Sequence, residues 1–238
     1  MDHHKKMKKV YLKMSETEPK KEYMPYAILV KKLLNKEIIP GLENIIAFDF
    51  DFVLDSYIEK YTIFVDARYL NFALKEVGKK LIISNLLTGY NLEFPIYYYL
   101  TIDVALKNVK NSFFNLINAN QNINVFCRYL DMEKFKNDKK FKTILSMEVS
   151  LAVIPQMTVD MLKLIYHTDE KNKNINAVVL LSNNRQLVPA IKELVNNDIA
   201  VYLGVSSVVH TPTEMMLNSS AIISLEKFLE DLGAITDI

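Results

Sequence analysis

Acidic and amide side chains follow several strand-like runs of this sequence. They are Asp49 and Asp51 in one run, Asp66 at the end of another, and the series Ser182-Asn183-Asn184 after a third. Ligands of open parallel sheets bind at the carboxyl ends of the strands, so these positions are the first to inspect for chemistry. Carboxylates gathered there would hold Mg²⁺ or Mn²⁺, because hard cations choose oxygen ligands and the bound cation polarises phosphate and activates water.

Two of the acids also have structural explanations. Asp66 is equally well placed to cap the helix that is expected to begin near Arg68. Asp160 lies in the expected helix TVDMLKL, either as a first-turn acid that complements the helix dipole or as a ligand that faces the crevice. A single carboxylate makes no metal site, so both alternatives stay open for each residue.

Other catalytic groups are scarce. The four histidines are scattered, and the single cysteine, Cys127, lies in a strand-like run, where a free cysteine belongs to the core more often than to a catalytic site. With five glycines, no glycine-rich phosphate loop can be written. One cysteine also excludes an intrachain disulfide and a cysteine-based zinc cluster, which favours a reducing compartment such as the cytoplasm.

The elements that would position these residues alternate between strands and helices. Strands are expected at 45–54, 61–67, 123–130, 176–182, 199–205 and 221–224. Helices are expected at 26–38, 68–78, 96–117, 158–168, 185–197 and 225–232, with Pro155 separating the ambiguous segment 144–154 from the helix after it. Continuous apolar strands alternating with helices predict an α/β fold, a three-layer sandwich with a mainly parallel central sheet.

Charge is distributed unevenly along the chain. Lys and Arg number 29 against 28 Asp and Glu, so the net charge of +1 excludes a chain-wide attraction to nucleic acid or an anionic membrane. Lysines concentrate in the tail 1–22 and in the loop after residue 130; those of the loop are Lys134, Lys136, Lys139 and Lys140. Both segments are either solvated or in contact with phosphate. No apolar run is long enough to span a membrane or to serve as a secretory signal, so we expect no membrane partner.

We expect two regions, a basic tail with an amphipathic helix at 1–44 and an α/β domain at 45–238. The helix at 26–38 is expected to pack on the domain or on a protein partner.

The carboxyl-terminal part of the chain resembles the NYN branch of the PIN-like nucleases. The order of strands, helices and turns in AVVLLSNNRQLVPAIKELVNNDIAVYLGVSS and LNSSAIISLEKFL agrees with that family. The family strand that corresponds to AVVLLS ends in the motif Ser-Gly-Asp-x-Asp-Phe. YTIFVDARYLNFAL is similar to its opening strand, and TVDMLKLIYH to its acid-bearing helix, so the resemblance covers about residues 61–232. It implies a parallel α/β sandwich and a metal held by Asp66 and Asp160, with Glu148 as a third acid if an insertion around Pro155 is allowed.

Two departures from the family pattern affect the expected chemistry. Tyr69 stands where the opening motif has asparagine. The acidic motif itself reads Ser-Asn-Asn-Arg-Gln-Leu at 182–187, so that amides replace both acids and Arg185 adds a positive charge. An amide oxygen can coordinate a hard cation but brings no charge, so metal binding should be severely weakened.

A second resemblance concerns IIAFDFDFVLDS, which is similar to the first motif of haloacid-dehalogenase-type phosphatases. It would make Asp49 the nucleophile and Asp51 the acid/base, with LLSNN at 180–184 as the second motif. No later strand-like run ends in the paired acids that this family also requires, which leaves the phosphatase as a remote alternative.

The function expected from these features is that of a degenerate PIN/NYN-like domain in RNA metabolism, a pseudonuclease that binds RNA or a ribonucleoprotein partner. Its contacts would be the motif residues Ser182, Asn183, Asn184 and Arg185 together with the four loop lysines. One alternative is an active Mg²⁺- or Mn²⁺-dependent endoribonuclease that uses Asp66, Asp160 and Glu148. Another is a structural subunit of a larger assembly, joined through residues 26–38.

Overall fold

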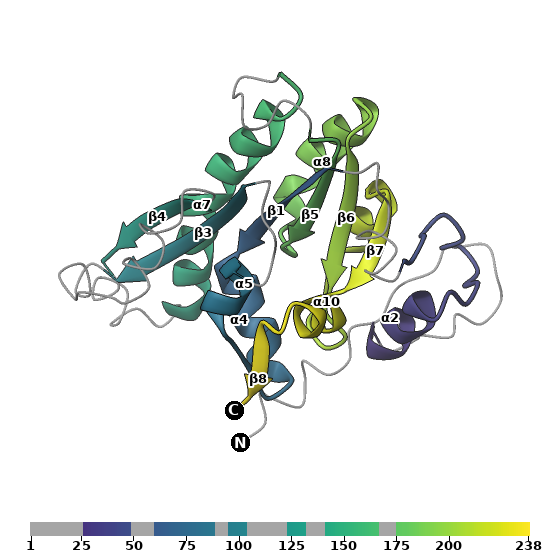
Figure 1. Cartoon of the computed structure of the whole chain (residues 1–238), viewed down its shortest axis with the longest axis horizontal. Helices are drawn as coiled ribbons and strands as arrows, with labels where there is room; N and C mark the ends of the chain where they lie inside the picture. Colours follow the sequence, from purple (N-terminus) through teal and green to yellow (C-terminus); the bar gives the residue numbers. More distant parts are fainter. Residues whose placement is uncertain (1–25, 49–59, 89–94, 104–122, 132–140, 167–174) are drawn as a thin grey trace.

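The computed structural model describes residues 26–48, 60–88, 95–103, 123–131, 141–166 and 175–238 (Figure 1), and of residues 102–103 and 141–151 it describes the backbone. Six strands form the central sheet, in the order β4-β3-β1-β5-β6-β7, and all neighbouring pairs are parallel. These strands are β1 (Tyr61–Asp66), β3 (Ile96–Asp103), β4 (Ile123–Leu130), β5 (Ala177–Leu181), β6 (Ala200–Val205) and β7 (Ala221–Ser224). A small antiparallel pair, β2 (Lys79–Leu81) with β8 (Ile235–Asp237), lies apart from it.

Helices cover both faces of the sheet, so the predicted three-layer α/β sandwich is confirmed. The helices that share a core with one face are α2 (Tyr26–Leu34), α7 (Phe141–Lys163), α8 (Val188–Asn196) and α9 (Thr213–Asn218). Those of the other face are α4 (Ala67–Glu76), α5 (Ile83–Thr88) and α10 (Leu225–Asp231). The central strands β1 and β5 are buried at every position, which is why they appear in the sequence as continuous apolar runs.

The predicted helix at 96–117 was wrong in its first part, which is strand β3. Tyr97, Tyr98 and Tyr99 are 8%, 4% and 1% exposed and lie between β1 and β4. Their side chains alternate between the two faces, because Tyr97 and Tyr99 belong to one core and Tyr98 to the other. Aromatic residues favour such a half-buried pleated surface, and pairing with two strands outweighed the helical spacing. Residues 104–117 lie outside the described part of the chain.

The predicted helix break at Pro155 was also wrong. Helix α7 continues through it as a single 23-residue element. Pro155 is exposed, whereas Val153, Ile154 and Met157 are at most 3% exposed and hold the helix against the sheet. A proline inside a helix costs about 3 kcal/mol or more, and the packing on both sides of Pro155 offsets that cost.

The amino-terminal helix belongs to the same core as the sheet. Tyr26, Leu29, Val30 and Leu33 of α2 are at most 7% exposed and pack in the cluster that contains α8 and α9. The apolar face that was expected to reach either the domain or a partner is therefore buried within this chain. The strand predicted at 45–54 is described only to residue 48, where Ala47 forms a parallel bridge with Ile222.

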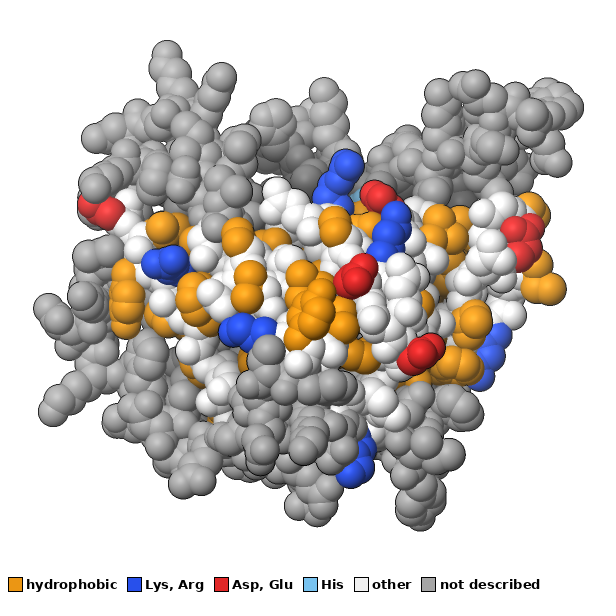
Figure 2. Space-filling view, turned by 90° about the horizontal axis from the view of Figure 1, so that it is seen from above, with side chains coloured by type: hydrophobic (Ala, Val, Ile, Leu, Met, Phe, Trp, Pro, Cys, Tyr) orange, Lys and Arg blue, Asp and Glu red, His pale blue; other side chains and the backbone are white. Residues whose placement is uncertain are grey.

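The surface carries charges of both signs. In Figure 2, Lys and Arg side chains are dispersed among acidic, apolar and uncharged ones, and the described residues of that side form no block of one sign. This agrees with the balanced net charge. None of the helices in the described ranges combines the length and hydrophobicity needed to cross a bilayer.

Candidate functional site

The strand order reverses between β1 and β5, and the predicted site lies at this point. From β1 the chain moves outward through β3 and β4, then returns to β5 on the other side of β1 and moves outward again. Val65 pairs with Leu181, so Asp66 and Ser182 are the next residues at the carboxyl ends of the two strands. Such a reversal creates the crevice in which open α/β sheets bind ligands.

Asp66 is occupied by donors of its own chain. Its Oδ1 accepts hydrogen bonds from the backbone N–H groups of Arg68 (3.1 Å) and Tyr69 (3.3 Å), which caps α4, and its Oδ2 accepts one from Ser182 Oγ (3.1 Å). The residue is 7% exposed. Burial raises the pKa of the Asp66 carboxyl, and these hydrogen bonds oppose the shift only in part. The capping alternative is therefore the observed role.

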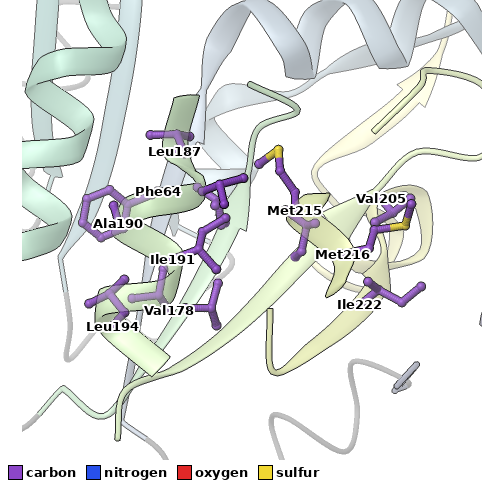
Figure 3. Close-up of a cluster of buried hydrophobic side chains, with 14 of the residues drawn as sticks. Phe64, Val178, Leu187, Ala190, Ile191, Leu194, Val205, Met215, Met216 and Ile222 are labelled. Carbon is purple, nitrogen blue, oxygen red and sulfur yellow. The ribbon is translucent and has the colours of Figure 1, made fainter. Parts of the chain in front are cut away.

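The turn after β5 uses its amides to shape the backbone. Asn184 caps the 3₁₀ helix η4 (Arg185–Leu187), because its Oδ1 accepts a hydrogen bond from the Gln186 N–H (3.0 Å). Asn183 Nδ2 donates to the His210 carbonyl (2.9 Å). Leu187 is fully buried in the cluster of Figure 3 and anchors the turn to the core. Arg185 is exposed at the first position of η4.

Asp160 is likewise paired within the chain. Its Oδ2 accepts a hydrogen bond from the Tyr99 hydroxyl (2.9 Å), and its Oδ1 accepts from Gln156 Nε2 (3.0 Å). Lys163 Nζ lies 2.8 Å from the same Oδ1, and the Asp160 side chain is 13% exposed. Burial and the neighbouring Asp160 charge raise the pKa of Tyr99, which keeps that hydroxyl a donor.

Glu148 and Asp160 cannot share one cation. Both belong to helix α7 and are twelve residues apart. At a rise of 1.5 Å per residue their backbones are separated by about 18 Å along the axis. Two oxygens bound to one Mg²⁺ lie only about 3–4 Å apart, given bonds of about 2.0–2.1 Å. The carboxylates cannot span the difference, so the predicted set Asp66, Asp160 and Glu148 does not form.

Within the described residues, no group of three or more His, Cys, Asp and Glu side chains is arranged to hold a metal ion. The remaining predicted site residues lie outside the part of the chain that the structure describes. They are the loop lysines Lys134, Lys136, Lys139 and Lys140 and the phosphatase candidates Asp49 and Asp51.

Two tyrosines to which the sequence predictions gave no role, Tyr69 and Tyr26, bridge elements next to this site. The Tyr69 hydroxyl donates to the Gly204 carbonyl (3.2 Å) and accepts from the Ser206 N–H (3.0 Å), which ties α4 to the carboxyl end of β6. The Tyr26 hydroxyl donates to the Ser206 carbonyl (3.3 Å) and accepts from the Thr211 N–H (3.0 Å). In the sequence, Tyr69 stood out only as a departure from the resembled pattern, which has asparagine at that position.

Comparisons with known proteins add no functional argument. No family model matches the chain, and no curated protein matches it. A structure of a protein of unknown function from Vibrio parahaemolyticus is 13% identical, with a TM-score of 0.46, over 72% of this chain and 95% of that one. A nicotinamidase from Staphylococcus aureus is 11% identical, with a TM-score of 0.31, over 73% of this chain and 94% of that one. Likenesses this distant do not assign a family or a function to this chain.

Proposed function

We propose that this chain is a PIN-like domain without nuclease activity that binds RNA at the carboxyl edge of its sheet. The observation that carries the proposal is that protein donors occupy both acids of the expected metal pair. Asp66 caps a helix and accepts from Ser182, while Asp160 accepts from Tyr99, Gln156 and Lys163.

A metal-dependent mechanism is poorly supported by this arrangement. A hard cation bound to protein takes oxygen ligands at about 2.0–2.6 Å, one or two of which are normally carboxylates that are not already neutralised. The ammonium group of Lys163 lies 2.8 Å from Asp160 Oδ1 and neutralises that carboxylate. Asn184 and Gln186 stand where the family has acids, and the Asn184 side chain accepts a hydrogen bond from the Gln186 N–H.

RNA is favoured over other partners by the charge that remains at this edge. The guanidinium of Arg185 is exposed beside Asn184, and an arginine suits phosphate because its planar fork donates two parallel hydrogen bonds. The loop lysines at 134–140 and the lysines of the tail stay predicted contacts of the same kind.

Fluorescence anisotropy with a labelled single-stranded RNA of mixed sequence tests the proposal. Arg185→Gln should weaken binding and lower the slope of log K against log salt by about 0.7, the value for one lost phosphate contact on a single strand. Lys192→Gln is the matched control, because Lys192 is exposed on α8 and has no place in the proposed contact. Equal affinity and equal slope for the two variants would contradict the role of Arg185.

The same RNA incubated with Mg²⁺ or Mn²⁺ should stay intact. Cleavage that depends on the metal and is abolished by Asp66→Asn would instead establish the ribonuclease alternative. If the wild-type chain binds no RNA but co-purifies with a fixed protein partner, the structural-subunit alternative gains support.

A further inference from the structure

A second candidate site lies on the opposite face of the sheet from α7 and is independent of the proposed RNA contact. A cavity of about 440 Å³ opens beside α4, at the carboxyl-terminal part of β3. Its walls include Arg68 and Asn71 of α4, Leu81 and Ile83 around the start of α5, and Leu100 of β3. Cavities that hold small organic molecules have volumes of about 300–1,000 Å³, so this one has room for such a ligand.

The described lining combines one cation with an apolar wall. Arg68 is its charged residue, and no Asp or Glu belongs to the described lining. Asp66, next in sequence to this lining, interacts electrostatically with Arg68, and its oxygens accept hydrogen bonds from the backbone of α4 and from Ser182. A guanidinium carries five N–H donors, so Arg68 can bind a ligand while keeping the contacts that it makes within the chain.

The polar and apolar groups lie on different elements. Arg68 and Asn71 are three residues apart on helix α4, so their side chains lie on the same face of that helix. Leu81, Ile83 and Leu100 come from the segment after α4 and from β3, and they pack against the core of this face. A ligand that fits both would carry a negative head group at α4 and an apolar body against the leucine and isoleucine side chains.

We propose that this cavity binds a small organic anion, with its carboxylate or phosphate on Arg68 and Asn71 and its apolar body against Leu81, Ile83 and Leu100. Carboxylate and phosphate share the geometry that a guanidinium recognises. The two head groups are therefore separated by experiment, with probes that have the same phenyl body.

The test is a titration followed by ¹H–¹⁵N NMR, with benzoate, phenyl phosphate and the uncharged isostere benzamide as probes. We expect saturable shifts of the amide signals around Leu81 and Ile83 with at least one anion, and binding of benzamide that is about ten-fold weaker or more. The anion with the higher affinity identifies the head group. Absence of saturable binding by both anions, or equal binding of benzamide, would overturn the proposal.

Variants locate the site. Arg68→Gln should weaken binding of the anion by about ten-fold or more, since it removes the charge and keeps part of the side-chain stem. Lys75→Gln makes the same charge change at an exposed position in the last turn of the same helix and should leave affinity within about two-fold. Asn71→Trp, at an exposed position, should obstruct the cavity without disturbing the core. Equal affinities of wild type, Arg68→Gln and Asn71→Trp would refute this assignment even if an anion binds elsewhere.

Discussion

The hydroxyl of Tyr69 should contribute strongly to stability, and Tyr69→Phe isolates that contribution. The ring is 3% exposed, and phenylalanine would preserve its packing while removing one oxygen. That oxygen satisfies two backbone groups, the Gly204 carbonyl and the Ser206 N–H. Ser206 is fully buried, so water cannot replace the lost partner.

The size of the effect follows from the two groups left without a partner. A buried donor or acceptor that loses its hydrogen bond costs about 1–3 kcal/mol. We expect Tyr69→Phe to lower the free energy of unfolding by about 2–4 kcal/mol, the carbonyl contributing less than the N–H because it retains other lone-pair directions. For a chain of this length, each kcal/mol corresponds to about 2–4 °C in Tm.

Urea unfolding followed by far-UV circular dichroism measures the change, with an unchanged m-value indicating that the denatured state is unaltered. Tyr166→Phe is the matched control, because it removes the same hydroxyl from a residue that is 69% exposed. It should change the free energy of unfolding by less than about 0.5 kcal/mol. If Tyr69→Phe is as stable as this control, the bridge between α4 and β6 does not stabilise the fold in the way described.

Three further outcomes are expected. Burial raises the pKa of Asp66 above its ordinary 3.8 in the folded state, so the folded chain binds that proton more tightly than the unfolded chain does. The contribution of Asp66 to stability therefore falls as pH rises from the unfolded pKa to the raised folded pKa. The stability of Asp66→Asn relative to wild type should therefore be more favourable at pH 7 than at pH 4 in urea unfolding, and the opposite trend would contradict the raised pKa. Because Lys163 neutralises Asp160, we expect no tight Mg²⁺ site, and millimolar Mg²⁺ should shift Tm by less than about 1 °C. A site that binds Mg²⁺ at 100 times its Kd would instead raise the free energy of unfolding by about 2.7 kcal/mol, which would contradict this expectation. Gly204→Ala should cost about 1–3 kcal/mol in urea unfolding, since the added Cβ would lie 2.5 Å from Leu181 Cδ2, and a neutral result would mean that the core yields at this point.

The carboxyl-terminal half of the fold was predictable because its signals are local. The runs at 176–182, 199–205 and 221–224 are continuous and apolar and are bounded by polar turns, and they correspond to β5, β6 and β7 within one residue at either end. The strand at 123–130 coincides with β4. A buried parallel strand requires no partner to be recognised, because both of its faces must be apolar.

Residues 96–103 show where local reasoning failed. This segment, with its three tyrosines, does not alternate strictly between polar and apolar residues. A helical period extending to residue 117 therefore fitted as well as a strand. The position of this segment between β1 and β4 makes it a strand, since each neighbouring strand supplies a ladder of hydrogen bonds. The same error hid the partner of Asp160, because Tyr99 reaches α7 only when this segment lies in the sheet.

The sequence alone determined the class of fold and which polar side chains follow the strands of the sheet, and its resemblance to the PIN-like nucleases predicted amides, Asn184 and Gln186, in place of two acids. These follow from residue type and from the order of apolar runs along the chain. Only the tertiary structure decided that α7 runs unbroken through Pro155, which separates Glu148 from Asp160, and that Lys163 pairs with Asp160. The physical reason is that a carboxylate has the same appearance in a sequence whether it binds a cation, caps a helix or pairs with lysine. Its role depends on the donors that folding brings within about 3 Å of its oxygens.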